Sequence, residues 1–309
     1  MQDFPYLISP FEAFKTIDEA CNWAKENQDA IERLLHQHGA ILLRRLPIST
    51  VRDFDSFSAS FGYDDFTYEK SFSNAVRINL TPRVFTANEA PPDTEIFLHH
   101  ELAQAHHFPS KIFFCCLSAA DEGGATPLCR SDLLFAEFKT QHPEWTQKFV
   151  DLGLKYTIQM PNKDNYNSGQ GRSWRSTLSV TSRTEAESRL TDLSYSWTWL
   201  EDQTLSATTP IMPAVRELSD GSISFFNQVI AVSKGWRRGK GVPAPLTFGD
   251  GSPIDDDILE ALTIISHPYT SALNWSSGDI ALVDNFRVMH GRHAYSGNTP
   301  RQVVVNLAR

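Results

Sequence analysis

Three side chains set the strongest constraint on how this chain can fold: His99, Glu101 and, far downstream, His290. An extended segment directs residues two apart to the same face, so His99 and Glu101 can converge on one point. His290 can complete the group from a second strand. Two imidazoles and one carboxylate suit non-haem Fe(II), because they leave neighbouring coordination positions of the ion open. The sequence therefore predicts a metal site shared by two distant strands.

The pair His99 and Glu101 is a weak signal when taken alone. The chain has ten histidines, and most His-x-Glu pairs are surface or capping pairs without a metal. His100 and Glu101 also begin the H-E-x-x-H pattern of zinc proteases, but Gln104 stands where the second histidine is required. His106 and His107 are out of register, so the zinc-protease interpretation is rejected.

Charge and composition bound the class of protein. A net charge of -9 and a pI near 5.6 argue against nucleic-acid binding, which needs clustered Lys and Arg. No apolar run is long enough to cross a bilayer, and we expect no membrane partner and no signal region. Small molecules are the expected partners. The cysteines lack CxxC spacing and predict reduced thiols in a cytoplasmic protein: Cys21, Cys115, Cys116 and Cys129.

Hydrophobic periodicity predicts a mainly β fold with peripheral α-helices. Thr16 and Glu19 form a capping-box pattern for a helix reaching about His38, which Gly39 would end, and Ser131 is expected to cap a helix through Phe138. Apolar and β-branched runs predict buried strands at 40–43, 96–98, 112–117, 126–128, 278–285, 287–290 and 302–307. Many strands with few helices indicate a jelly roll, the double-stranded β-helix of cupin-like proteins.

One polar stretch interrupts this pattern around residues 162–176. It is rich in Asn, Ser and Gly and contains Trp174 between basic residues. Loops of that length are either lids over active sites or disordered, and the alternative here is a solvated loop anchored by one tryptophan. The candidate ligands lie on both sides of this insertion. We therefore expect a single domain over residues 1–309.

Several ordered motifs carry a resemblance to a known family. They are PPDTEIFLHHELAQ (91–104), PSKIFFCCLSAADEGGATPLCRSDLLF (109–135) and GDIALVDNFRVMHGRHAYSGNTPRQVVV (278–305), with a weaker likeness at HGAILLRRLPI. They resemble the taurine dioxygenase/clavaminate synthase family of Fe(II)- and 2-oxoglutarate-dependent oxygenases, especially its clavaminate-synthase-like and syringomycin-biosynthesis-like members. The resemblance implies an enzyme that uses Fe(II), 2-oxoglutarate and O2.

The resemblance also implies roles for single residues. His99, Glu101 and His290 match the family's metal ligands, while Arg301 matches the arginine that holds the distal carboxylate of 2-oxoglutarate. A guanidinium suits that task because its planar fork can donate two hydrogen bonds to one carboxylate. Thr126 matches the threonine that helps to bind the same carboxylate. Without the resemblance, a surface ion pair and an ordinary strand hydroxyl would be the preferred interpretations of Arg301 and Thr126.

Two departures from the family pattern narrow the substrate. Glu101 replaces the aspartate typical of the taurine branch, which agrees with the clavaminate-synthase-like side and excludes the related halogenases, where a small residue leaves room for chloride. Val305 stands where sulfonate-binding members have an arginine, which argues against taurine.

The residues of the substrate pocket are harder to assign. Gln104 and Asn227 match polar positions near the family's active site, although polar groups that satisfy the backbone are at least as common. Arg292 can hold a substrate carboxylate or pair with an acidic side chain.

The implied reaction is oxidation of an unactivated C–H bond, by hydroxylation or by desaturation or ring closure. The expected substrate is a free or carrier-tethered amino acid, or an amino-acid-derived specialised metabolite. A catalytically silent metal-binding jelly roll that acts as a sensor or partner protein is the alternative, and a zinc hydrolase is a third. Arg301 and Thr126 distinguish the enzyme from the silent protein, because a silent scaffold needs no residues that bind a cosubstrate.

Overall fold

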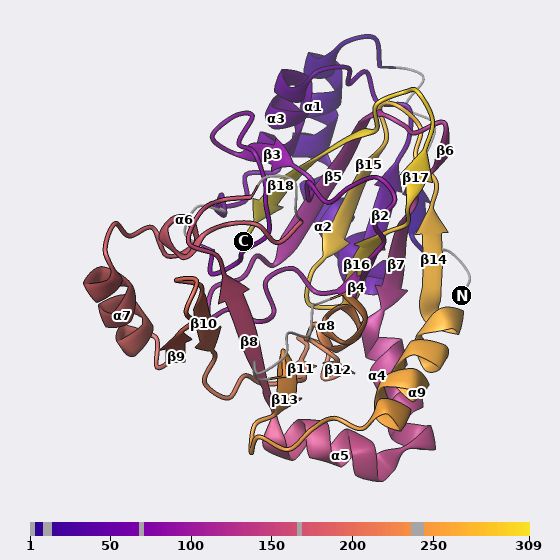
Figure 1. Ribbon diagram of the computed structural model, residues 1–309. Coiled ribbons are helices and arrows are strands. Elements are labelled where there is room, and N and C mark those ends of the chain that lie inside the picture. Colours follow the sequence, from indigo (N-terminus) through magenta and orange to yellow (C-terminus); the bar gives the residue numbers. More distant parts are fainter. Residues whose placement is uncertain (1–3, 9–13, 68–70, 166–168, 236–243) are drawn as a thin grey trace.

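The computed structural model describes residues 4–8, 14–67, 71–165, 169–235 and 244–309, and two facing sheets form its centre (Figure 1). The larger sheet has the order β1-β2-β15-β5-β18-β3 and the smaller one β14-β7-β16-β4. The strands of the larger sheet, in that order, are Tyr6–Ile8, Ala40–Leu43, Ile280–Asp284, Lys111–Ser118, Gln302–Ala308 and Val84–Thr86. Those of the smaller sheet are Thr270–Leu273, Thr126–Arg130, Val288–Arg292 and Ile96–His99. This is the predicted jelly roll with helices around it.

Strand β5 shows why the sequences of strands in the larger sheet are apolar at nearly every position. Ile112 and Phe114 face the core between the two sheets, whereas Phe113 and Cys115 face a second core under the N-terminal helices. A strand that is buried on both faces has no need for polar alternation. All four cysteines are buried and free in this structure, in agreement with the prediction of thiols.

The N-terminal helices cover the outer face of the larger sheet, as Figure 1 shows. The predicted capping box is present: Thr16 accepts from the Glu19 N–H and begins α1 (Ile17–Glu26). The single helix expected up to His38 is wrong, because Asn27 interrupts it and α2 (Gln28–His38) follows. A further capping box at Thr50 begins α3 (Val51–Ala59).

Residues 131–266 form helices and a separate sheet that pack around the two facing sheets. In β7, Leu128 faces the inter-sheet core while its neighbour Cys129 faces a third core made with helices of this region. The helices are α4 (Ser131–Gln141), α5 (Pro143–Leu152), α6 (Trp174–Leu178), α7 (Arg183–Asp192), α8 (Val229–Gly235) and α9 (Asp256–Ser266), with a 3-10 turn at His267–Tyr269. A separate sheet has the order β13-β8-β10-β9, formed by Leu246–Phe248, Leu154–Met160, Leu205–Thr208 and Ser196–Trp199. Short pairs are β6 (Glu122–Gly123) with β17 (Tyr295–Ser296) and β11 (Arg216–Glu217) with β12 (Ile223–Ser224).

The insertion predicted at 162–176 runs beside this separate sheet. Trp174 begins α6 and is only 1% exposed, and Arg175 lies over its ring. Residues 166–168 fall outside the described ranges. The tryptophan thus anchors the described end of the insertion.

Ser131 does not cap a helix as predicted. It is the first residue of α4, and its hydroxyl donates to the Arg287 carbonyl and lies 2.8 Å from Nε2 of His100. The capping pattern failed because the hydroxyl is used in a tertiary contact instead of a local one. That contact links α4 to the segment that carries the candidate metal ligands.

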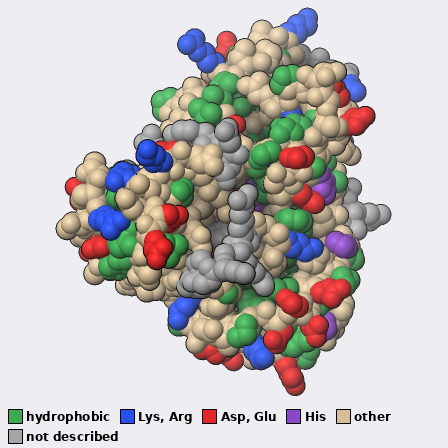
Figure 2. Space-filling model, in the orientation of Figure 1, with side chains coloured by type: hydrophobic (Ala, Val, Ile, Leu, Met, Phe, Trp, Pro, Cys, Tyr) green, Lys and Arg blue, Asp and Glu red, His purple; other side chains and the backbone are tan. Residues whose placement is uncertain are grey.

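No helix within the described ranges is long and apolar enough to cross a membrane. On the face drawn in Figure 2, basic, acidic and hydrophobic side chains of the described residues all reach the surface, and several acidic ones lie near one another at the lower right.

Gly39 provides a test of how tightly the helical layer is joined to the sheets. Its φ is +79°, and a Cβ there would lie 2.7 Å from Cγ2 of Val288. Gly62 has a similar φ of +67° but an added Cβ would meet nothing within 4 Å. We expect Gly39→Ala to lower the free energy of unfolding by about 3 kcal/mol, and Gly62→Ala by about 1 kcal/mol from backbone strain alone. Urea denaturation measures both, and equal losses would show that the contact with Val288 relaxes freely.

Candidate metal centre

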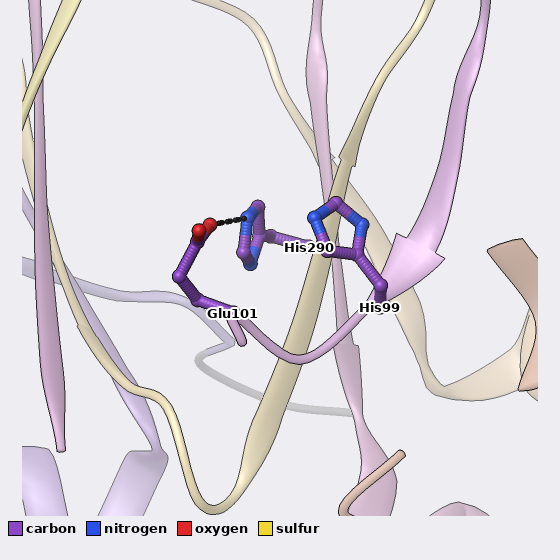
Figure 3. Close-up of side chains that lie close together, drawn as sticks. All are labelled: His99, Glu101 and His290. Atoms are coloured by element: carbon purple, nitrogen blue, oxygen red, sulfur yellow. Dashed lines mark ion pairs between the residues drawn. The ribbon is translucent and has the colours of Figure 1, made fainter. Parts of the chain in front are cut away.

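The pairing of β4 with β16 brings two histidines together. His290 lies directly opposite His99 in the antiparallel register, and residues so paired project from the same face of a sheet. Their ring centroids are 4.3 Å apart. Figure 3 shows the two rings side by side with the Glu101 carboxylate next to them. The sequence prediction that a second strand supplies a third side chain at this point agrees with this geometry.

Glu101 stands in the turn that follows β4, and a buried amide fixes its backbone. Oδ1 of Asn285 accepts from the Glu101 N–H at 2.8 Å, and Nδ2 of Asn285 donates to the Glu101 carbonyl at 3.0 Å. The same Nδ2 also donates to the carbonyl of Pro109. Leu102, the next residue, has a φ of +58°, which is a strained value for leucine. Asn285 thus holds the turn that directs the Glu101 carboxylate toward the histidines.

The three side chains fit a divalent metal. One ligand atom from each of His99, Glu101 and His290 lies within 4.8 Å of the others. Nδ1 of His99 lies 2.8 Å from the Phe97 carbonyl, which can only accept, so the lone pair of His99 is on Nε2. Nδ1 of His290 is buried without a hydrogen-bond partner among the described residues. Two neutral imidazoles and a carboxylate are the donor set that Fe(II) takes in two-histidine, one-carboxylate sites.

Burial and charge put His99 and Glu101 in the protonation states that a metal requires. Burial, with His290 nearby, lowers the pKa of His99 to about 4, so this imidazole is neutral at pH 7. Burial alone would raise the pKa of Glu101, but Arg77 and the two histidines outweigh it and lower the pKa to about 2. A neutral imidazole and an ionised carboxylate are the forms that bind metal ions.

Arg77 is a functional candidate that the sequence analysis missed. Its Nη2 donates to Oε2 of Glu101 at 2.8 Å, and the two side chains are only 7% and 5% exposed. Arg77 is also within 5.5 Å of the ring centre of Phe85. A single charged residue in the apolar run Ala75-Val76-Arg77-Ile78 was the available signal, but nothing local named its partner.

Thr126 and Arg301 line the same pocket as the three candidate ligands. Nε of Arg301 donates to the Gly124 carbonyl, while Nη1 and Nη2 make no hydrogen bond within the described part of the chain. Burial, together with Arg292, lowers the pKa of Arg301 to about 10, which leaves it a cation at neutral pH. The Nε of Arg301 is therefore fixed by the backbone, and its two terminal nitrogens are available to a ligand.

Trp275 prepares Thr126 as a donor. Its Nε1–H donates to Oγ1 of Thr126 at 2.9 Å, so one lone pair of the hydroxyl is occupied. The hydroxyl hydrogen remains available for an acceptor in the pocket. Trp275 precedes β15 and was not singled out from the sequence, since no spacing pattern connects it with Thr126.

Two of the three candidate substrate residues, Gln104 and Arg292, line the pocket, and Asn227 does not. Gln104 lines the pocket, and its Oε1 is buried without a partner among the described residues. Asn227 does not line it: its side chain donates to the Ala214 carbonyl and accepts from the Val229 N–H. The prediction of Asn227 at the pocket is therefore wrong, and its neighbour Gln228 lines the pocket instead.

Arg292 organises a loop. Nη1 and Nη2 donate to the backbone carbonyls of four residues, which are Asn88, Ala90, Pro91 and Thr94. The predicted alternatives were a substrate carboxylate or an acidic side chain, and these four carbonyls occupy both terminal nitrogens instead. Nε of Arg292 is buried without a partner in the described structure.

A jelly roll in which two histidines and a carboxylate lie beside a buried arginine is typical of one class of protein, the non-haem metal oxygenases. Residues 9–307 match the model of the family described as taurine catabolism dioxygenase TauD, TfdA family. The chain belongs to this family. It is therefore a dioxygenase that uses Fe(II), 2-oxoglutarate and O2, as this family does. The alternatives of a catalytically silent protein and a zinc hydrolase no longer describe it.

Relatives of known name agree with this assignment. The chain is 34% identical over 313 residues to the clavaminate synthase-like protein At3g21360 of Arabidopsis thaliana, covering 99% of this chain and 94% of the relative. It is 23% identical over 287 residues to the dapdiamide synthesis protein DdaC of Enterobacter agglomerans, covering 89% and 84%. Among solved structures, an asparagine oxygenase in complex with Fe(II), 2S,3S-3-hydroxyasparagine and succinate shares the fold with a TM-score of 0.55, at 13% identity over 94% of this chain and 83% of that one.

Arg77 and Glu101 form a buried ion pair whose coupling can be measured in the metal-free protein. We expect Arg77→Met to lower the free energy of unfolding by about 3–5 kcal/mol at pH 7, because it leaves a buried carboxylate without its cation. Adding Glu101→Gln to this variant removes the unpaired charge and should restore part of that loss. Urea denaturation of the two single variants and the double variant completes the cycle. Strictly additive losses would show that the two side chains are not coupled.

Proposed function

We propose that this enzyme oxidises an unactivated C–H bond of an amino acid or an amino-acid-derived metabolite, with His99, Glu101 and His290 as the iron ligands. The observation that carries the proposal is the joint presence, in one pocket, of this ligand cluster and the open guanidinium end of Arg301. Bound Fe(II) would supply the oxidising chemistry, in which 2-oxoglutarate and O2 are converted to succinate and CO2 as the substrate is oxidised.

Three residues divide the work of binding 2-oxoglutarate. Arg301 supplies a cation for its distal carboxylate, and Thr126 supplies a hydroxyl donor for the same group. Trp275 is a positioning residue, because its bond to Oγ1 fixes the direction in which the Thr126 hydrogen points. Such donors are set before the cosubstrate arrives, which reduces the entropy lost on binding.

The rest of the pocket controls what is oxidised. Leu102, Phe114 and Val305 line it with apolar surface, which limits the water that can reach the reacting centre. The open Oε1 of Gln104 is an acceptor suited to an ammonium or amide N–H of the substrate. Hydroxylation is the default outcome of this chemistry, and desaturation or ring closure requires a different placement of the substrate.

The relatives support an amino-acid-derived substrate. DdaC is named for the synthesis of dapdiamide, and the asparagine oxygenase was solved with a hydroxylated asparagine. We extend to this chain the substrate class that these names suggest, as a free or carrier-tethered amino acid. We further propose that the chain is one cytoplasmic catalytic domain, with the 162–176 insertion as a lid, and that it belongs to the syringomycin-like branch.

The iron-ligand assignment has a direct spectroscopic test. An anaerobic titration of the metal-free protein with Fe(II) and 2-oxoglutarate should produce the visible charge-transfer band of the chelate. His99→Ala should abolish the band, since two remaining ligands hold the ion too weakly. His293→Ala, at a half-exposed histidine outside the pocket, is the matched control and should keep it. A parent protein without the band would count heavily against the proposal.

The cosubstrate anchors predict a graded series in the same titration. Arg301→Ala should weaken 2-oxoglutarate binding by about 100-fold or more, because a charge-assisted bidentate contact is lost. Trp275→Phe keeps an aromatic ring but removes the indole N–H. This variant should weaken 2-oxoglutarate binding by roughly 3–10-fold. Fe(II) affinity, measured without 2-oxoglutarate, should stay near the parent value in both variants. A matching loss of Fe(II) affinity would instead indicate a general collapse of the pocket.

A further inference from the structure

Tyr295 contacts both the arginine assigned to 2-oxoglutarate and the arginine that holds the loop before β4. The Cζ atom of Arg301 lies 5.5 Å from the centre of the Tyr295 ring, and that of Arg292 lies 5.2 Å from it. Cations at such distances over an aromatic ring are attracted by its electron-rich face. The ring thus joins two positive groups that would otherwise only repel each other.

The backbone fixes Tyr295 in this position. The residue belongs to β17, and the register pairs it with Gly123 of β6. Gly124 follows, and its carbonyl accepts from Nε of Arg301 at 3.0 Å. A Cβ on Gly124 would lie 2.9 Å from Cδ of Arg301 and 3.2 Å from Cβ of Tyr295, so a larger residue would crowd both side chains. The short β6–β17 pair therefore positions the guanidinium of Arg301.

The loop of residues 88–94, which connects β3 with β4, depends on Arg292. Four carbonyls of this loop accept hydrogen bonds from the two terminal nitrogens of Arg292. The N–H of Tyr295 donates to a fifth carbonyl, that of Pro92, at 2.9 Å. Hydrogen bonds from a cation are stronger than those between neutral groups. The loop is therefore sensitive to the position of Arg292 and to the charges around it.

The same loop forms part of the wall of a second cavity. This cavity has a volume of about 590 Å³ and shares Asn74 and Asn88 with the pocket of the candidate ligands. The loop residues that line it are Asn88, Ala90, Pro91 and Thr94. A ligand in this cavity would therefore contact the residues whose carbonyls Arg292 binds.

Binding of 2-oxoglutarate changes the charge next to Arg292. Burial and the nearby charge of Arg292 both disfavour the cationic form of Arg301, so the two guanidinium groups repel each other in the free pocket. A carboxylate on Arg301 would offset that repulsion, and Arg292 would then bind its four carbonyls more firmly. Linkage makes the effect reciprocal, because an ordered loop favours binding at Arg301 by the same factor. Tyr295 keeps the two groups close enough for this coupling.

We propose that Tyr295 positions Arg301 for 2-oxoglutarate and couples the binding of this cosubstrate to the order of residues 88–94. This proposal rests on the proposed function, in which Arg301 binds the distal carboxylate, and adds how that contact reaches the second cavity. Tyr295 is a positioning residue, since it acts through the two arginines. The wall of the second cavity is then more ordered when 2-oxoglutarate is bound than when it is absent.

Hydrogen–deuterium exchange of single loop amides tests the coupling. The Ala90 N–H donates to Oδ1 of Asn88 at 2.8 Å, and the Thr94 N–H donates to the Pro91 carbonyl at 3.0 Å. Both amides are thus protected until the loop opens. In the anaerobic protein with Fe(II), saturating 2-oxoglutarate should slow their exchange by about 5-fold or more. The Ser222 N–H, in a turn that lines neither cavity, is the control and should not change.

Two substitutions of Tyr295 separate the ring from the hydroxyl. Tyr295→Leu should weaken 2-oxoglutarate binding by about 5–10-fold, because the contact of the ring with Arg301 is lost. In this variant, saturating 2-oxoglutarate should no longer slow the exchange of the loop amides. Tyr295→Phe keeps the ring and should keep both properties of the parent. Fe(II) affinity, measured without 2-oxoglutarate, should be unchanged in both variants.

Arg292→Lys gives an independent measurement that does not require Tyr295→Leu to fold. An ammonium keeps the charge but loses the planar fork, so the loop amides should exchange faster and respond less to 2-oxoglutarate. If Tyr295 only packs against its neighbours, Tyr295→Leu exchanges faster throughout, yet 2-oxoglutarate still slows the loop as in the parent, and that result overturns the proposal. A parent that forms the charge-transfer band but shows unchanged loop exchange also overturns it, and leaves the proposed function standing. A parent without the band overturns the proposed function, and this proposal with it.

Discussion

The register between β4 and β16 is the constraint on which the site depends. Pairing His99 with His290 puts both imidazoles on one face at the edge of the jelly roll, and a slip of one residue would turn one ring to the other face. The register is fixed from both sides, because β16 also pairs with β7 and the turn after β4 is clamped by Asn285. The jelly roll thus fixes the positions of the three side chains, and helices pack against the outer faces of its sheets.

Buried charge is the second condition for such a site. A carboxylate in a dry pocket would take up a proton and lose its value as a ligand, but Arg77 holds Glu101 ionised. Arg301 remains charged although it is buried, and it has no carboxylate partner among the described residues. The pocket therefore has an excess of positive charge without its ligands. Binding of the dianionic cosubstrate in this pocket, as we propose, would compensate that excess.

The sequence was informative where a pattern is local or a motif is ordered. The strand runs, the capping box at Thr16 and the convergence of His99, Glu101 and His290 were predicted, and the structure brings these three side chains together. The sequence was uninformative where a side chain contacts a residue that is distant along the chain. Asn285 and Arg77 act on Glu101 from 184 and 24 residues away, and no local pattern encodes such a contact. The prediction for Asn227 was wrong for a related reason, because its amide forms hydrogen bonds with nearby backbone groups.

The division of the active-site space follows from this architecture. Arg77, Arg292 and Arg301 bring positive charge to the pocket that holds the candidate ligands, which suits the dianionic cosubstrate proposed for it. The sheet around β8 lies outside the jelly roll, and its Thr157 and Gln159 line a second cavity of about 590 Å³ that shares Asn74 and Asn88 with the pocket of the candidate ligands. We therefore expect the specificity of this enzyme to depend on this second cavity, apart from the reaction that its family shares.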